Sequence, residues 1–170
     1  EAVFQAEAIV VGGGNTWQLV KMLHENHLMS PVRERVLAGI PYIGWSAGAN
    51  VACPTLRTTN DMPITDPLGF DTFNLVPFQI NPHYFSGKVM FRNPKGEILE
   101  YAGETRDDRL NEFHAVNETP ILALPEATFL KVENQNAVYL GLDTGAPARV
   151  FKKGKSPEDF KDRSDLSGLF

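Results

Sequence analysis

Short apolar runs divide the chain into predicted strands. Residues 8–11, 40–43 and 121–124 are almost entirely apolar, and the first of these runs has no polar interruption. A strand that does not alternate between apolar and polar residues is typical of a parallel sheet, where both faces are covered. Weaker strand patterns are predicted over residues 73–80, 129–132, 138–142 and 149–152. The tripeptide Asn81-Pro82-His83 is expected to end the 73–80 strand.

Helical spacing appears in the segments between these runs. Trp17, Val20, Leu23 and Leu28 would share one helix face, after an N-cap at Asn15 or Thr16. Three further helices are expected: one capped by Ser30, with Pro31 as its first residue and Gly39 at its end, one that starts over residues 49–53, and one from Thr105 to about Val116.

This alternation predicts an α/β fold, with an open, mostly parallel sheet and helices on both faces. The length of 170 residues fits one domain over residues 1–170. Residues 55–72 are expected to form a long polar loop, and residues 93–96 a turn whose flanks could form a hairpin. Residues 153–170 are charged and turn-rich, so we expect a loosely held tail. The first strand begins within a few residues of Glu1, so we also expect N-terminal strands to be missing from this chain.

Composition narrows the possible partners. The net charge is −5 and no basic run stands out, which argues against binding to nucleic acid or to an anionic membrane. The single cysteine, Cys53, excludes an internal disulfide and indicates a reducing compartment. No apolar stretch in the sequence is long enough to span a bilayer.

The most informative stretch is the pentapeptide Gly-Trp-Ser-Ala-Gly at residues 44–48. A serine between small residues, at a predicted strand-to-helix turn, is the pattern of a nucleophile elbow. The glycines would let the backbone turn sharply and would lift the Ser46 hydroxyl above the end of the sheet. The alternative is a tight turn with an incidental serine.

Three other features also follow predicted strands: the glycine turn at residues 12–14, His83 and Glu126. The carboxyl ends of parallel strands form the usual site of an open α/β sheet, so we expect these features to meet Ser46. His83 could then act as the base that activates the serine, and Glu126 could orient the imidazole. The N–H groups of Gly14 and Ala47 could stabilise an oxyanion.

Each of these features has an ordinary alternative. His83 could be a hydrogen-bonded histidine at the edge of the core, and Glu126 a solvated loop carboxylate. The glycine turn could instead hold a phosphate, although it lacks both the P-loop sequence and the full dinucleotide-binding spacing. Cys53 is interpreted as a small buried hydrophobic residue. His24, His27 and His114 are expected at the surface, with no third ligand to complete a metal site with the first two.

Several blocks of the chain resemble the peptidase E family of α-aspartyl dipeptidases. They are residues 43–64, which hold the elbow, and the shorter blocks at 11–16, 79–83, 103–106 and 124–126. The resemblance implies a fold like that of class I glutamine amidotransferases, which is flavodoxin-like. It also implies a serine dipeptidase that cleaves after an N-terminal aspartate through an acyl-enzyme.

Residue roles follow from the same resemblance. It implies Ser46 as nucleophile, His83 as base, Glu126 as the third member of the triad and Gly14 in the oxyanion hole. Arg106 would bind the aspartate side chain of the substrate, and Asp61 its amine; by default both would be ordinary solvated charges. The resemblance further implies a cytoplasmic enzyme with a dipeptide substrate and no cofactor or metal, and the partner could be a second copy or a complementing N-terminal segment.

Three other readings stay open. The first is a cyanophycinase-like hydrolase, although the block Thr58-Thr59-Asn60-Asp61 favours the dipeptidase. The second is an esterase of the α/β-hydrolase type, which would need the order serine, acid, histidine, and only His114 could then supply the histidine. The third is an inactive binding module on the same fold. The segment between His83 and Gly103 is also longer than expected for bacterial members of the family.

Overall fold

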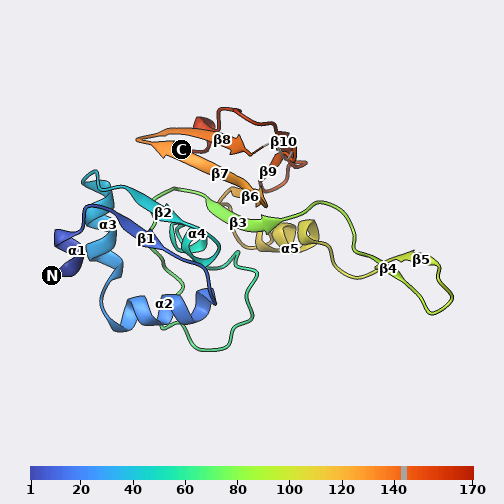
Figure 1. The fold of residues 1–170 in the computed structure, drawn as a ribbon, viewed down its shortest axis with the longest axis horizontal. Coiled ribbons are helices and arrows are strands. Elements are labelled where there is room, and N and C mark those ends of the chain that lie inside the picture. The colour runs from blue at the N-terminus through green and yellow to red at the C-terminus, as the bar shows by residue number, and fades with distance from the viewer. Residues whose placement is uncertain (143–144) are drawn as a thin grey trace.

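The computed structural model describes residues 1–142 and 145–170; strands and helices alternate in the N-terminal part of the chain, and strands predominate in the C-terminal part (Figure 1). The helices are α1 (Ala2–Gln5), α2 (Thr16–Glu25), α3 (Met29–Leu37), α4 (Ala47–Val51), α5 (Arg106–Phe113) and the 3-10 helix η1 (Ser167–Leu169). The strands are β1 (Ile9–Val11), β2 (Tyr42–Gly44), β3 (Gln79–Tyr84), β4 (Met90–Arg92), β5 (Ile98–Glu100), β6 (Ile121–Pro125), β7 (Thr128–Glu133), β8 (Asn136–Gly141), β9 (Ala148–Phe151) and β10 (Glu158–Phe160).

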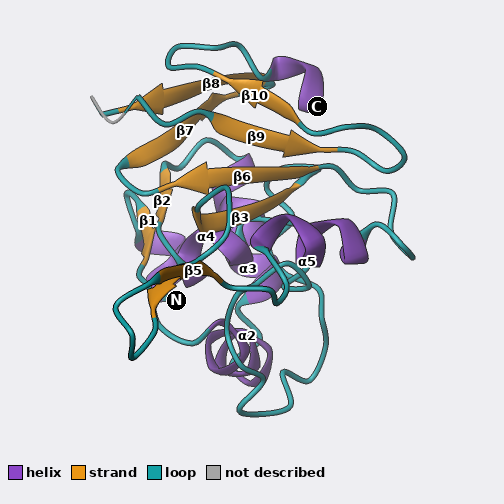
Figure 2. Cartoon of the chain, turned by 90° about the vertical axis from the view of Figure 1, so that its right-hand side faces the viewer, coloured by secondary structure: helices purple, strands orange, loops and turns teal. Residues whose placement is uncertain are grey.

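Among the described residues, two pairs of strands are parallel. β1 pairs with β2, and β3 pairs with β6, in both cases parallel. β6 also pairs with β9, and β9 pairs with β10, in both cases antiparallel. The larger sheet therefore has the order β10-β9-β6-β3 (Figure 2). β4 with β5 and β7 with β8 form separate antiparallel hairpins. The predicted open α/β fold is confirmed, and no closed barrel occurs in the described part of the chain.

The short helix α4 joins the two sheets. It packs against β1 and β2 on one side and against β3 on the other, and it also contacts α2. Val51 from this helix is fully buried in a cluster with Val20 of α2 and with Leu56 and Phe73. A second cluster holds Phe78, Leu122 and Tyr139 beneath the larger sheet. The segment that carries Ser46 is therefore fixed from both sides.

Some predicted boundaries are wrong. β3 begins at Gln79, and Asn81, Pro82 and His83 belong to it instead of ending it. Pro82 is tolerated because the register with β6 shifts between Asn81 and Tyr84, a bulge at which no regular ladder bond is required. α3 begins at Met29, so that Ser30 and Pro31 lie in its first turn, where the missing N–H of proline costs little.

Burial of the first parallel pair also differs from the expectation. Val10 of β1 and Ile43 of β2 are 59% and 56% exposed, so one face of this pair is open. No described segment covers that face. The other face carries Ile9, Val11 and Tyr42, which pack against the core cluster around Val20.

The C-terminal segment is not a loosely held tail. β10 pairs with β9, and Leu166 and Leu169 are buried in the cluster beneath the larger sheet. The ring of Phe170 meets that of Phe78 edge-on, with 5.6 Å between their centroids. Apolar residues spaced among the charges of this segment explain its packing, because their burial outweighs the cost of ordering the segment.

The β4–β5 hairpin forms around the expected turn and reaches away from the rest of the chain (Figure 1). All of its strand residues are exposed. Across the described residues, every helix is too short or too polar to cross a bilayer.

Candidate active site

The predicted elbow around Ser46 is present. Ser46 has φ 55° and ψ −116°, a strained conformation for a residue with a side chain, and it lies between β2 and α4. A Cβ at Gly44 would lie 2.5 Å from the carbonyl oxygen of Gly48, and a Cβ at Gly48 would lie 2.1 Å from that of Val11. Any residue with a Cβ atom at either position would therefore clash with the backbone. The two glycines are therefore what allows strand, turn and helix to pack this closely.

The glycine turn after β1 lies directly against this elbow. The Cβ position of Gly13 is 3.5 Å from the Ser46 hydroxyl oxygen, and that of Gly12 is 3.3 Å from the Trp45 ring. Gly14 has φ 138°, which glycine adopts without strain. No hydrogen bond among the described residues uses the N–H of Gly14 or that of Ala47. Both donors are thus unengaged within the described part of the chain; Ala47 directly follows Ser46, and Gly14 directly follows the glycine that lies against it.

His83 and Glu126 meet at the carboxyl ends of two neighbouring strands. The Nδ1 atom of His83 lies 2.5 Å from a carboxylate oxygen of Glu126. The parallel pairing of β3 and β6 brings the two side chains together, because Tyr84 is opposite Pro125. His83 has φ 57° at the bulge, and its side chain is 47% exposed although its strand neighbours Pro82 and Tyr84 are buried. With its proton on Nδ1, the imidazole donates a hydrogen bond to Glu126, and its Nε2 atom is left free to accept a proton.

Ser46 and His83 come from adjacent parts of the fold, since α4 packs on both β2 and β3. Within residues 1–142 and 145–170, no hydrogen bond joins the Ser46 hydroxyl to His83. Such bonds are often long or absent before substrate binds. The structure therefore joins His83 directly to Glu126 and places the glycine turn against Ser46.

Asp61 belongs to the long loop after α4 and lies beside the N-terminus of α2. Its Oδ2 atom accepts a hydrogen bond of 2.7 Å from the Thr16 N–H and one of 3.2 Å from the Thr59 hydroxyl. Its backbone carbonyl accepts a bond of 3.0 Å from the Trp17 indole. The carboxylate thus interacts with the positive end of the helix dipole and ties the long loop to α2. Its other oxygen, Oδ1, accepts no bond from the described residues.

Arg106 is the first residue of α5 and lines a shallow pocket of about 210 Å³. Its Nη1 atom is buried without a hydrogen-bond partner, and its guanidinium carbon lies 5.9 Å from the centre of the Phe85 ring. Burial, together with nearby Arg109, lowers the pKa of Arg106, yet an arginine remains charged at neutral pH. A buried donor without a partner is costly, so this pocket favours a ligand with a carboxylate.

Two asparagines that were not predicted as site residues, Asn60 and Asn81, connect the long loop to β3. The Asn81 amide donates to the Thr58 carbonyl at 2.8 Å and to the Asn60 side chain at 2.7 Å. Asn60 in turn donates to the Pro82 carbonyl at 2.9 Å. These bonds hold the loop that carries Asp61 against the residue before His83. The position of Asn81, directly after the mostly apolar segment 73–80, was the available signal, because a buried amide needs partners.

Cys53 is a buried structural residue, as interpreted from the sequence. Its sulfur accepts the Ile80 N–H at 3.0 Å and donates to the Ala49 carbonyl at 3.4 Å. Burial raises the pKa of the Cys53 thiol to about 12, although the Ile80 N–H partly offsets this effect. The thiolate form, which is the nucleophile, is therefore scarce at neutral pH.

We expect native Cys53 to resist alkylation. Iodoacetamide at pH 8 should leave it unmodified for hours, and it should react within minutes in strong denaturant, because only unfolding exposes the sulfur and returns its pKa to the ordinary range. Intact-mass spectrometry measures both rates. Equal rates in native and unfolded protein would contradict the buried position.

The remaining histidines do not form a second site. His114, expected at the surface, is buried, and its Nε2 atom lies 3.0 Å from the Thr119 carbonyl. His24 contacts the Asp71 carbonyl at 3.2 Å. Among the residues that the structure describes, no three histidine, cysteine or acidic side chains are grouped to hold a metal.

Comparison with known proteins identifies relatives along the whole chain. The model of peptidase family S51 matches residues 1–140. A peptidase E from Nostoc sp. is 44% identical over 170 residues, which cover 99% of this chain and 65% of the relative. A peptidase E from Salmonella paratyphi A is 49% identical over 155 residues, covering 91% of this chain and 62% of the relative. The chain thus spans less than two thirds of the length of these relatives.

A solved structure shows the same fold. The crystal structure of a peptidase from an acI-B1 Actinobacterium superposes with a TM-score of 0.62 at 16% sequence identity. The match covers 96% of this chain and 60% of that one. At this identity the similarity concerns the fold alone.

Proposed function

Because this chain belongs to peptidase family S51, we propose that it is a serine dipeptidase that cleaves after an N-terminal aspartate. Ser46 is the nucleophile, His83 the general base and Glu126 the group that orients the imidazole. The observation that carries the proposal is the contact of 2.5 Å between His83 Nδ1 and Glu126. It leaves His83 Nε2 as the proton acceptor for a serine already placed on a strained elbow.

The reaction proceeds in two steps. Ser46 Oγ attacks the carbonyl carbon of the peptide bond while His83 takes the hydroxyl proton, and Glu126 stabilises the resulting imidazolium. The N–H groups of Gly14 and Ala47 stabilise the negative oxygen of the tetrahedral intermediate. His83 then gives its proton to the leaving amine. Water, deprotonated by His83, hydrolyses the ester between the aspartyl group and Ser46 and restores the enzyme.

Substrate choice depends on two charged groups. Arg106 pairs with the side-chain carboxylate of the substrate aspartate, which would satisfy its buried Nη1 atom. The free oxygen of Asp61 pairs with the substrate α-amine. A dipeptide that lacks either group leaves a charge of the protein unpaired, and this penalty selects against it.

A peptide panel on the full-length protein tests this function. Asp-Leu should be cleaved, and Asn-Leu, Leu-Leu and acetyl-Asp-Leu should be poorer in kcat/KM by about 10,000-fold, because each loses one charged contact. Chromatography of the released leucine measures the rates. Equal rates on all four peptides would overturn the proposed specificity. Arg106→Ala is the matched variant, since it should remove most of the preference for Asp-Leu over Asn-Leu.

A further inference from the structure

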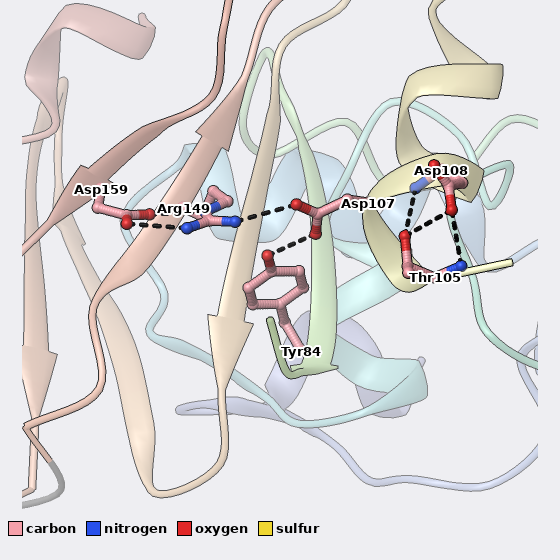
Figure 3. Close-up of polar contacts among 6 residues, drawn as sticks. All are labelled: Tyr84, Thr105, Asp107, Asp108, Arg149 and Asp159. Atoms are coloured by element: carbon pink, nitrogen blue, oxygen red, sulfur yellow. Dashed lines mark hydrogen bonds and ion pairs between the residues drawn. The ribbon is translucent and has the colours of Figure 1, made fainter. Parts of the chain in front are cut away.

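A network of hydrogen bonds joins four elements of the fold (Figure 3). The Tyr84 hydroxyl donates to Asp107 Oδ1 at 2.6 Å, and Arg149 donates to Asp107 Oδ2 at 2.9 Å. Arg149 also binds both carboxylate oxygens of Asp159, at 2.7 and 2.9 Å. The network thus runs from β3 through α5 and β9 to β10. Both oxygens of Asp107 are used, so removing any one member leaves another without its partner.

The network is partly withdrawn from water. Tyr84 is 4% exposed, and the side chains of Arg149 and Asp107 are 23% and 28% exposed. Burial and the neighbouring Asp107 raise the pKa of Tyr84, so its hydroxyl stays protonated and donates. Hydrogen bonds to charged groups in such a setting hold their geometry better than bonds at the open surface.

Two members of the network are the chain neighbours of two proposed site residues. Tyr84 follows His83 on β3, and Asp107 follows Arg106 on α5. On β3 the bulge directs His83 outward and Tyr84 inward, so anchoring Tyr84 also fixes the backbone that carries the imidazole. The start of α5 is fixed as well, because Thr105 and Asp108 form a capping box around it (Figure 3).

We propose that Tyr84, Asp107 and Arg149 are positioning residues that set the spacing between the base and the carboxylate-binding arginine. The inference rests on the proposed function, because it assigns that spacing to His83 and Arg106. The direct bond from Tyr84 to Asp107 connects the backbone next to His83 with the backbone next to Arg106. Arg149 binds the other carboxylate oxygen of Asp107. A shift of about 1 Å between such groups lowers a rate by about 100-fold.

Two conservative variants test the inference in the full-length protein. Tyr84→Phe removes only the hydroxyl, and Asp107→Asn keeps the shape of the side chain but weakens its hold on Arg149. We expect each to lower kcat/KM for Asp-Leu by about 10- to 100-fold and to narrow the preference for Asp-Leu over Asn-Leu. Tyr84→Phe should also slow the reaction of Ser46 with a fluorophosphonate, which needs His83 but not Arg106.

Tyr139→Phe is the matched control. Tyr139 is fully buried on β8, and its hydroxyl donates to the Ala146 carbonyl at 2.6 Å, outside the network. Loss of this bond should lower the Tm about as much as Tyr84→Phe does and should leave both kinetic readouts unchanged. If Tyr84→Phe and Asp107→Asn match Tyr139→Phe in kinetics as well as in Tm, the positioning role is overturned. A wild-type protein that cleaves no peptide and resists the fluorophosphonate would overturn the proposed function together with this inference.

Discussion

Ser46→Ala should lower kcat/KM for Asp-Leu by about four orders of magnitude or more. Removal of the hydroxyl leaves the imidazole of His83 with nothing to activate, and the acyl-enzyme cannot form. The elbow backbone should persist, because alanine is no larger than serine. Steady-state kinetics with Asp-Leu gives the loss in rate, and the Tm should change little.

Cys53→Ala is the control for this substitution, since Cys53 is the single cysteine of the chain and follows Ser46 by seven residues. Its sulfur is buried between Ile80 and Ala49, so the variant should lose stability and keep the rate within a few-fold. A loss of activity in Cys53→Ala with activity retained in Ser46→Ala would show that the assigned nucleophile is wrong.

Gly48→Ala should disrupt the elbow and destabilise the fold by about 3 kcal/mol or more. The added methyl group would lie 2.1 Å from the Val11 carbonyl oxygen, and backbone on both sides of the contact leaves no flexible atom to move aside. α4 must therefore separate from β1, which would carry Ser46 away from the glycine turn at residues 12–14. Chemical denaturation measures the loss of stability, and fluorophosphonate labelling measures the loss of the site.

Gly168→Ala provides the comparison, because a Cβ at Gly168 meets no atom within 4 Å and its backbone needs no left-handed conformation. This variant should change stability by less than about 0.5 kcal/mol. If Gly48→Ala were as stable and as reactive as Gly168→Ala, the close approach of α4 to β1 would not be required.

Local signals in the sequence accounted for most elements of the fold. Asn15 and Thr105 do cap α2 and α5, as their side-chain acceptors indicate. β3 was placed too early because Asn81-Pro82-His83 has the composition of a turn. Its strand conformation comes from pairing with β6, about 40 residues away in the chain, and local composition cannot express that pairing.

The candidate site, like the fold, could be predicted only in part from the sequence. The elbow and the approach of His83 to Glu126 follow from glycine spacing and from the rule that parallel strand ends share one edge. The tethers from Asn60 and Asn81, and the bond between Arg149 and Asp107, join residues of ordinary surface types from distant segments. Nothing in their local sequence indicates the partner, so only the folded arrangement reveals them.

The projecting β4–β5 hairpin connects the strand that carries His83 to the helix that begins with Arg106. Its strands bury no residue, yet Lys88, Val89 and Tyr101 at its base form part of the rim of the Arg106 pocket. Insertions and deletions there reshape the entrance while the packed interior stays intact. Changes in this hairpin can therefore alter the entrance of the Arg106 pocket, and with it the ligands that the pocket admits, at little cost to folding.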